Sequence, residues 1–250
     1  LRYCESPAAQ ILREADDGDG PRYLKVHRKD WRNRLLPGVQ DTLLPDGRPF
    51  HYEPMDWRTF WYVVLDVSTG PTELIIGNPR YRFCSFPFRR EGDFRCDSEE
   101  INAVVEMSWR TFQLCSHETF EDCPYYEQLN YVFDARNEAL ISYAMTGDNR
   151  LARHSLIQFR DTLRHDGMIQ SRAPSRSRQR IPLFALWWIR MLHDFRQWVG
   201  PSSFSVLRES LFCVEGILRW FEERRDEEGW IGSLPDWNPG GGTGAVGTSL

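Results

Sequence analysis

The chain lacks the features that several large protein classes require. Its six cysteines form no CxxC pairs, which argues against a structural zinc site and against a small disulfide scaffold, so we expect mostly reduced thiols. No stretch approaches the roughly 20 consecutive apolar residues that cross a bilayer. The net charge is only −5, with basic residues spread over the whole length. Neither nucleic acid nor a membrane is therefore an expected partner.

The chain begins at Leu1 and not at an initiator methionine, and its first residues lack the charged n-region and apolar run of a signal peptide. We therefore expect both ends to be cuts inside a longer protein. The 250 residues, 41% of them hydrophobic, suffice for one large domain or two ordinary ones. What the chain does have is aromatic residues, at 14%, including 10 tryptophans. Such rings stack on the flat faces of sugars, although a single tryptophan more commonly fills a core.

Residues 1–95 have the pattern of β-strands. Short runs rich in β-branched and aromatic residues alternate with the turn signals PDG, TGP and NP. The clearest predicted strands are residues 57–67, 72–76 and 81–86, separated by turns at hairpin-like spacing. An antiparallel β-sandwich is the predicted architecture of this part.

Residues 96–250 have the pattern of helices. Asp97 is a candidate N-cap with Glu100 three residues later, a capping box that opens the first helix. Further helices are predicted at about 125–146, 149–164, 182–198 and 203–225. Their short connections predict consecutive antiparallel hairpins.

Acidic residues concentrate in segment 117–136, around the predicted start of the second helix, with Pro124 in its first turn. On a helix, Glu127 and Asp134 share one face, with Glu138 one turn further along. A solvated acidic face is the commoner explanation of such a pattern. Here the flanking aromatic side chains favour a cleft that binds sugar. Glycoside hydrolysis requires two carboxyl groups, one to protonate the leaving oxygen and one to activate water or attack carbon.

Glu127 is the candidate acid of this cluster. The positive end of a helix dipole favours an ionised carboxylate. We therefore expect Glu127 to keep its proton only through burial or through repulsion from Asp122 and Asp134. Tyr131 lies between the carboxylates on the predicted helix, and Cys123 is expected to be a packed small residue and not a nucleophile.

The sequence DCPYYE at 122–127 resembles the Asp-Cys-Pro-x-Arg-Glu signature of the bacterial α-L-rhamnosidases of glycoside hydrolase family 78. The segments EPMDWRTFWYVVLDV, SWRTFQLCSHETFEDCPYYEQ, GMIQSRAPSR, IPLFALWWIRMLHDF and LPDW also look like that family. The resemblance covers residues from about 50 to the C-terminus. It implies a β-sandwich segment (1–95) followed by an all-α (α/α)6 toroid of helical hairpins (96–250), incomplete in this chain. It also implies inverting hydrolysis of terminal α-L-rhamnosyl or related residues, with carbohydrate as the partner and no cofactor.

The same resemblance assigns roles to residues. Glu127 is implied to be the general acid, and the residues implied to contact the sugar are Asp122, Tyr126, Asp134, Trp230, Asp236 and Trp237. For the last three, a flexible connection is an equally good alternative. Tyr126 stands where the family has Arg, and NYVFD replaces Gly-Trp-x-Gly-Asp, so contacts that select the substrate differ. The family's base is a glutamate far downstream, and no residue of this chain is assigned to that role.

Other patterns favour structural roles. The basic loop SRAPSRSRQR has no interleaved aromatic residues and is predicted to be solvated. Trp187 and Trp188 are predicted core rings, while His117 and His193 lack partners at metal-ligand spacing, so no metal site is predicted. The alternative function is a non-catalytic carbohydrate-binding or scaffold protein of the same fold. A pocket-facing glutamate encoded beyond Leu250 would favour the enzyme.

Overall fold

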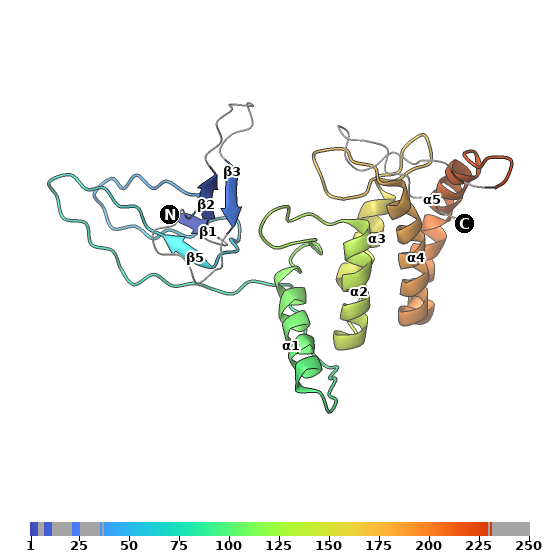
Figure 1. Cartoon of the computed structure of the whole chain (residues 1–250), viewed down its shortest axis with the longest axis horizontal. Coiled ribbons are helices and arrows are strands. Elements are labelled where there is room, and N and C mark those ends of the chain that lie inside the picture. Colours follow the sequence, from blue (N-terminus) through green and yellow to red (C-terminus); the bar gives the residue numbers. More distant parts are fainter. Residues whose placement is uncertain (5–7, 12–21, 26–35, 37, 230, 232–250) are drawn as a thin grey trace. The chain divides into compact units, whose positions relative to one another are not determined.

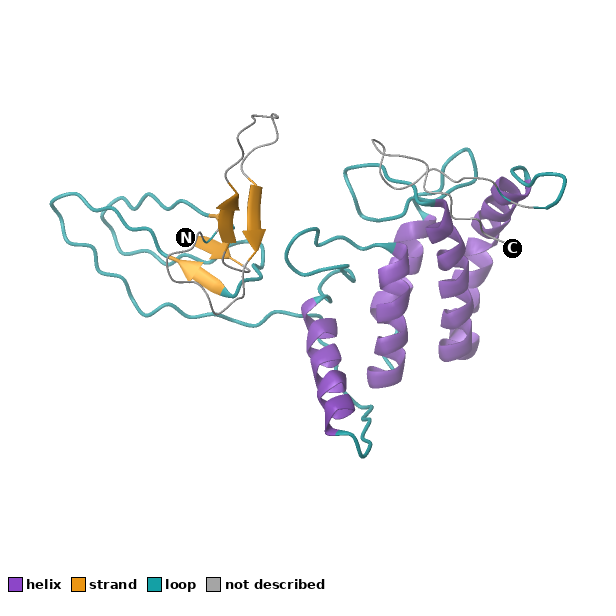
Figure 2. Ribbon diagram, in the orientation of Figure 1, coloured by secondary structure: helices purple, strands orange, loops and turns teal. Residues whose placement is uncertain are grey.

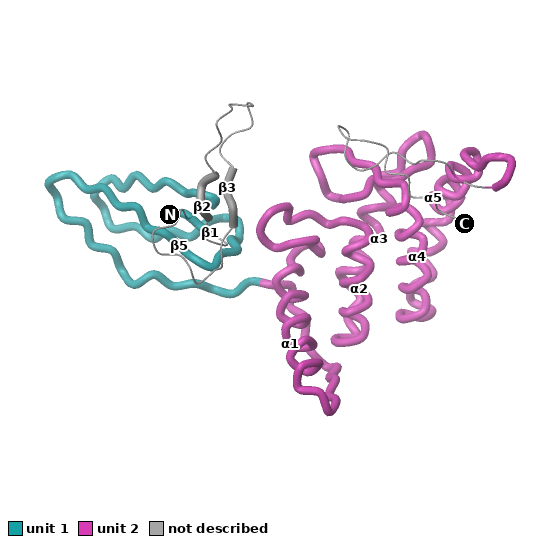
Figure 3. Tube along the Cα trace, viewed as in Figure 1, with its two compact units in different colours: residues 1–84 teal, residues 85–250 magenta. Residues whose placement is uncertain are grey.

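The structure is a computed structural model that describes residues 1–4, 8–11, 22–25, 36, 38–229 and 231. The chain divides into two compact units, residues 1–84 and residues 85–250 (Figure 3). The first unit consists of short strands and extended loops and the second consists of helices (Figure 1, Figure 2). No helix in the described ranges is both long and apolar enough to cross a membrane.

The first unit contains a small antiparallel sheet. Strand β1 (Arg2–Cys4) pairs with β4 (Val39–Gln40) on one side and with β5 (Tyr62–Val64) on the other. A separate antiparallel pair joins β2 (Ala8–Ile11) to β3 (Arg22–Lys25). The predicted antiparallel pairing is confirmed, and a sandwich of two packed sheets stays a prediction.

The predicted strands at 57–67, 72–76 and 81–86 are largely wrong. Within the first, only β5 pairs with another strand, and the other two segments are extended loops. Most of their apolar side chains are exposed, Ile75 to 84% and Tyr81 to 87%, whereas Phe86 is half-buried. β-Branched and aromatic residues indicate that a segment suits a pleated, half-buried surface. A strand forms only where a second strand pairs with it, and no described residue pairs with these two segments.

The described part of the second unit contains five α-helices: α1 (Glu99–Leu114), α2 (Val132–Thr146), α3 (Arg150–Arg160), α4 (Pro182–Val199) and α5 (Phe204–Glu222), the last preceded by a 3-10 turn, η1 (Gly200–Ser203). The predicted helices are confirmed apart from their ends, with the largest error at α2, which begins at Val132 and not at residue 125. The N-cap of α1 is Ser98, whose hydroxyl accepts the Ile101 N–H. The predicted capping box is therefore wrong, because position N3 from Ser98 holds isoleucine and not glutamate.

Helices α2 to α5 pack in two layers. Helix α2 lies beside α4 and helix α3 lies beside α5, so that alternate helices are neighbours as well as consecutive ones (Figure 1). Trp188 on α4 is fully buried, and its indole N–H donates a 3.1 Å hydrogen bond to the Leu156 carbonyl on α3. Trp187 is partly buried against the ring of Phe133. Successive hairpins of this kind build six-hairpin folds, while closure into a toroid stays a prediction.

Candidate active site

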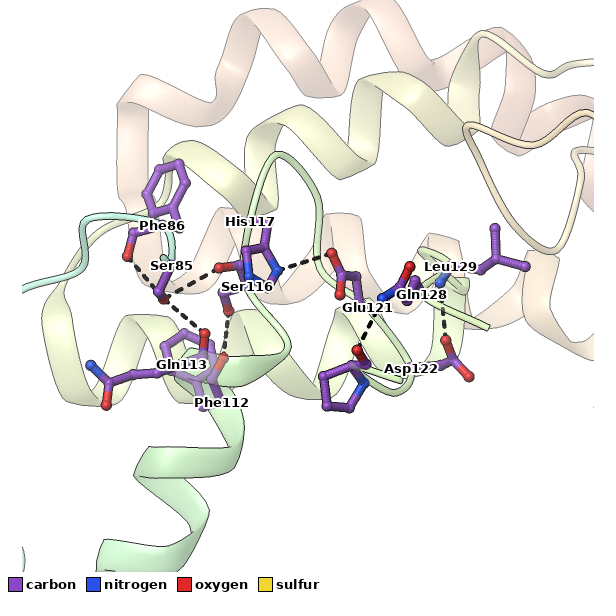
Figure 4. A network of polar contacts seen from close by, with 11 residues as sticks. Ser85, Phe86, Phe112, Gln113, Ser116, His117, Glu121, Asp122, Gln128 and Leu129 are labelled. Carbon is purple, nitrogen blue, oxygen red and sulfur yellow. Dashed lines mark hydrogen bonds and ion pairs between the residues drawn. The ribbon is translucent and has the colours of Figure 1, made fainter. Parts of the chain in front are cut away.

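The loop 122–129 precedes α2 and carries two of the predicted site carboxylates. Two hydrogen bonds close it: the Asp122 N–H donates to the Leu129 carbonyl (2.9 Å), and the Leu129 N–H donates to Asp122 Oδ1 (3.1 Å) (Figure 4). Gln128 has a φ of 54°, in the left-handed region that interrupts a helix. Its side-chain amide donates to the Pro124 carbonyl at 3.1 Å. Pro124 therefore lies in a turn of this loop. The predicted position of Pro124, in the first turn of the helix, is wrong.

The loop starts from a fixed point at the end of α1. The Ser116 hydroxyl donates to the Phe112 carbonyl at 2.7 Å, and the Ser85 hydroxyl donates to the Gln113 carbonyl at the same distance (Figure 4). The backbone N–H of Glu121 donates to the carbonyl of Cys115 at 2.9 Å. Residues that precede Asp122 are thus tied to a helix end, which limits the positions that its carboxylate can take.

Glu127 is held by a tyrosine. The Tyr131 hydroxyl donates to Glu127 Oε2 at 2.6 Å, and the Glu127 N–H donates to Cys123 Sγ at 3.3 Å. Glu127 precedes α2 and therefore does not share a helical face with Asp134, which corrects the predicted geometry. It is also exposed, so burial, one of the two expected means of keeping its proton, is absent.

Tyr131 is fixed in turn by a backbone bridge to the segment after α3. The Val132 N–H donates to the Ser171 carbonyl and the Ala173 N–H donates to the Asn130 carbonyl, both at 3.0 Å. This bridge places Arg172 beside Tyr131, and Arg172 Nη1 donates to the Tyr131 hydroxyl at 2.9 Å. The prediction of a solvated basic loop is therefore wrong for Arg172, which is half-buried.

Asp134 completes the group of carboxylates from the first turn of α2. Burial raises the pKa of Asp134, its own backbone N–H opposes that rise, and the negative charges of Asp122 and Glu127 raise it further. The three carboxylates that the sequence singled out thus lie within electrostatic range of one another. Two of them lie in the loop 122–129 and the third lies at the start of α2, so they do not share one face of a helix.

A second layer of acids lies deeper. Glu138 is on α2, one turn after Asp134, and burial raises its pKa well above the ordinary value, with the negative charges of Asp134 and Glu121 adding to the rise. Burial also raises the pKa of Glu121, against the effect of His117, whose Nδ1 lies 3.1 Å from Glu121 Oε1. The predicted alignment of acids along α2 holds for Asp134 and Glu138, and Glu138 is half-buried. In the part of the chain that the structure describes, no group of His, Cys, Asp or Glu side chains could hold a metal ion.

A comparison with known protein families identifies the family of this chain. Residues 89–238, more than half of the chain, match the family described as the bacterial alpha-L-rhamnosidase 6 hairpin glycosidase domain. The chain belongs to this family. No curated protein matches the chain.

Two solved rhamnosidases resemble this six-hairpin glycosidase chain. The GH78 family rhamnosidase of Bacillus sp. GL1 is 28% identical, with a TM-score of 0.56, over 62% of this chain and 16% of its own. A rhamnosidase from Klebsiella oxytoca with rhamnose bound is 22% identical, with a TM-score of 0.52, over 57% of this chain and 28% of its own. The second likeness shows the fold alone. The chain thus spans about a sixth of the length of the first protein and less than a third of the second.

Of the remaining predicted site residues, the structure describes Tyr126 only. Tyr126 is exposed, and its ring meets that of Tyr125 edge to face, with centroids 4.8 Å apart. Trp230, Asp236 and Trp237 lie outside the described residues. Sequence reasoning noted Tyr131 but did not single out Arg172. No local signal marked Arg172, because its partner is 41 residues away and the two meet only through the backbone bridge.

In chemical terms, the site presents an exposed glutamate flanked by two other carboxylates. Because Tyr131 donates to Oε2 of Glu127, a proton carried by Glu127 belongs on Oε1. Asp122 and Asp134 add acceptors of the type that bind sugar hydroxyls. Such an arrangement suits proton donation to a glycosidic oxygen.

Proposed function

We propose that the complete natural polypeptide containing this sequence is an inverting glycoside hydrolase that removes terminal α-L-rhamnosyl or related sugar residues. Glu127 donates a proton to the leaving oxygen, while Asp122 and Asp134 accept hydrogen bonds from sugar hydroxyls. The observation that carries the proposal is the grouping of these three carboxylates around the loop before α2, with Glu127 held by Tyr131. The choice of sugar rests on the rhamnosidase relatives.

The proposal extends to the fold and to the partner carboxylate. We assign residues 1–95 to the end of a β-sandwich and residues 96–250 to the first part of an (α/α)6 toroid, which the pairing of alternate helices supports. Inversion requires a base that activates water on the face of the sugar opposite the acid, roughly 6.5–9.5 Å from it. No residue of this chain is assigned as that base.

The test compares the wild-type polypeptide with Glu127→Gln on a panel of aryl glycosides that includes α-L-rhamnosides. Glutamine keeps the shape of the side chain but has no proton to give. We expect kcat/KM to fall about 10²- to 10⁴-fold for a poor leaving group. We expect a much smaller loss for 2,4-dinitrophenyl rhamnoside, whose departure needs little protonation. Proton NMR of the first product should show the inverted anomer.

Glu118→Gln is the matched control, because Glu118 is an exposed acid of the same segment with no assigned role. It should leave kcat/KM unchanged. Equal activity of Glu127→Gln and wild type would remove Glu127 as the acid. If the wild-type polypeptide turns over no glycoside but binds rhamnose, the chain belongs to a carbohydrate-binding protein of the same fold.

A further inference from the structure

The hydrogen bonds at Glu127 continue beyond Tyr131 to a cation. Arg172 Nη1 lies 2.9 Å from the Tyr131 hydroxyl, and that hydroxyl lies 2.6 Å from Glu127 Oε2. Arginine has donors and no acceptor, so Arg172 donates to the tyrosine oxygen. The single hydroxyl proton of Tyr131 is then available only for the carboxylate. The direction of donation in this series of hydrogen bonds, from Arg172 through Tyr131 to Glu127, follows from this chemistry.

We propose that Tyr131 and Arg172 are positioning residues for the acid: Tyr131 orients the carboxyl of Glu127 and sets the pH range in which it holds its proton, and Arg172 acts through Tyr131. This inference rests on the proposed role of Glu127. A hydrogen bond to Oε2 fixes the rotation of the carboxyl group and assigns the transferable proton to Oε1. It also stabilises the ionised carboxylate, so that the acid releases its proton more readily to the leaving oxygen.

The tyrosine is suited to this role because it keeps its own proton. Burial raises the pKa of the Tyr131 phenol, the hydrogen bond to Glu127 raises it further, and Arg172 lowers it. The phenol therefore stays a donor across the range in which a glycosidase works. Arg172 opposes the rise and polarises the O–H bond, which strengthens the hydrogen bond to the carboxylate.

The geometry is built into the fold and does not depend on surface side chains. Tyr131 is buried, and its ring packs edge to face on Phe184 of α4, with centroids 6.3 Å apart. The bridge that aligns Tyr131 with Arg172 is reinforced by Asn130, whose buried amide donates to the Ala173 carbonyl at 2.8 Å. Tyr131 and Arg172 are thus held in place by the fold, and Tyr131 in turn holds the exposed side chain of Glu127.

The charged groups near this series of hydrogen bonds come from three segments. Asp122 lies in the loop, Asp134 lies on α2, and Arg172 lies after α3. The two aspartates repel a negative charge on Glu127, whereas Arg172 favours it. The Tyr131 hydroxyl, 2.6 Å from Glu127 Oε2, is the group through which Arg172 reaches the carboxylate.

The test is the pH dependence of kcat/KM in Tyr131→Phe, Arg172→Met and the double variant of the complete polypeptide. Phenylalanine keeps the ring that packs on Phe184 and removes only the hydroxyl. We expect the alkaline limb of Tyr131→Phe to move up by about one pH unit, with about a tenfold lower kcat on alkyl rhamnosides and little loss on 2,4-dinitrophenyl rhamnoside. Arg172→Met should shift the limb in the same direction by less. In the Tyr131→Phe background it should add little, because Arg172 acts through the hydroxyl.

Three variants serve as controls. Tyr143→Phe removes a buried hydroxyl of α2 that hydrogen-bonds to none of the described residues, and Arg176→Met removes an exposed cation of the same loop as Arg172, so neither should move the alkaline limb. If Arg172→Met does not fold, Arg172→Lys replaces it. Lysine keeps the positive charge, so the pH profile of this variant should lie closer to that of the wild type. An unmoved limb in Tyr131→Phe, with Glu127→Gln inactive, would overturn this inference and leave the proposed function standing. Full activity of Glu127→Gln would overturn both.

Discussion

At the scale of single residues, Glu138 shows how the site is linked to stability. Its raised pKa means that folding favours the protonated form. Both folded and unfolded chains are protonated below the ordinary pKa of 4.5, and the unfolded chain ionises first as the pH rises. The stabilising contribution of Glu138 is therefore complete below pH 4.5 and is lost progressively above it. Glu138→Gln, which stays neutral, should gain stability relative to wild type as the pH rises, measured by urea unfolding at pH 4.5, 6 and 8.

Glu118→Gln is the control, since Glu118 is an exposed acid, and its difference from wild type should change less between these pH values than that of Glu138→Gln. A constant difference between Glu138→Gln and wild type at all three pH values would contradict the assignment. The sequence predicted Glu138 and Asp134 on one helical face, and that is confirmed. It could not predict how far each acid is buried, because burial depends on segments that pack against α2 from elsewhere in the chain. Arg172 was missed for the same reason.

At the scale of elements, two glycines fix the packing of the turn after α3 against α5. A Cβ on Gly167 would lie 2.7 Å from the carbonyl oxygen of Gly216, and Gly167 has a φ of 88°. Gly167→Ala therefore combines backbone strain with a clash against a helix backbone. We expect a loss of about 2–4 kcal/mol in the free energy of unfolding by urea denaturation.

Gly147→Ala separates the two effects. Gly147 ends α2 with a φ of 64°, but a Cβ there meets nothing within 4 Å. Strain alone should cost about 1 kcal/mol. Equal losses in the two variants would show that the contact between Gly167 and Gly216 contributes nothing. At this scale the sequence was most informative, because periodicity located each helix that the structure describes in the second unit. The start of α2 was misplaced since Asp122 caps a loop with its side chain, and the acidic run before the helix resembles a helix N-terminus.

At the scale of the molecule, the two units differ in how much of their structure sequence patterns could predict. Helices satisfy their backbone hydrogen bonds internally, so periodicity and caps were enough to place four of the five within a few residues. Strands depend on partners. Segments 72–76 and 81–86 have strand composition but no partner strand among the described residues, and most of their apolar side chains are exposed. Local pattern therefore predicted the helical unit and overestimated the sheet.

The last prediction concerns the chain of 250 residues by itself. Asp122 and Asp134 belong to the loop and helix start that also position Glu127, so we expect the carboxylates grouped here to lie on one side of the bound sugar. Inversion needs a second carboxylate on the opposite face, and none of this chain is assigned to it. We expect no hydrolysis of any aryl α-L-rhamnoside by these 250 residues alone, while the complete polypeptide is active and loses its activity in Glu127→Gln. Turnover by the 250-residue chain, abolished in the same variant, would show that it contains its own base.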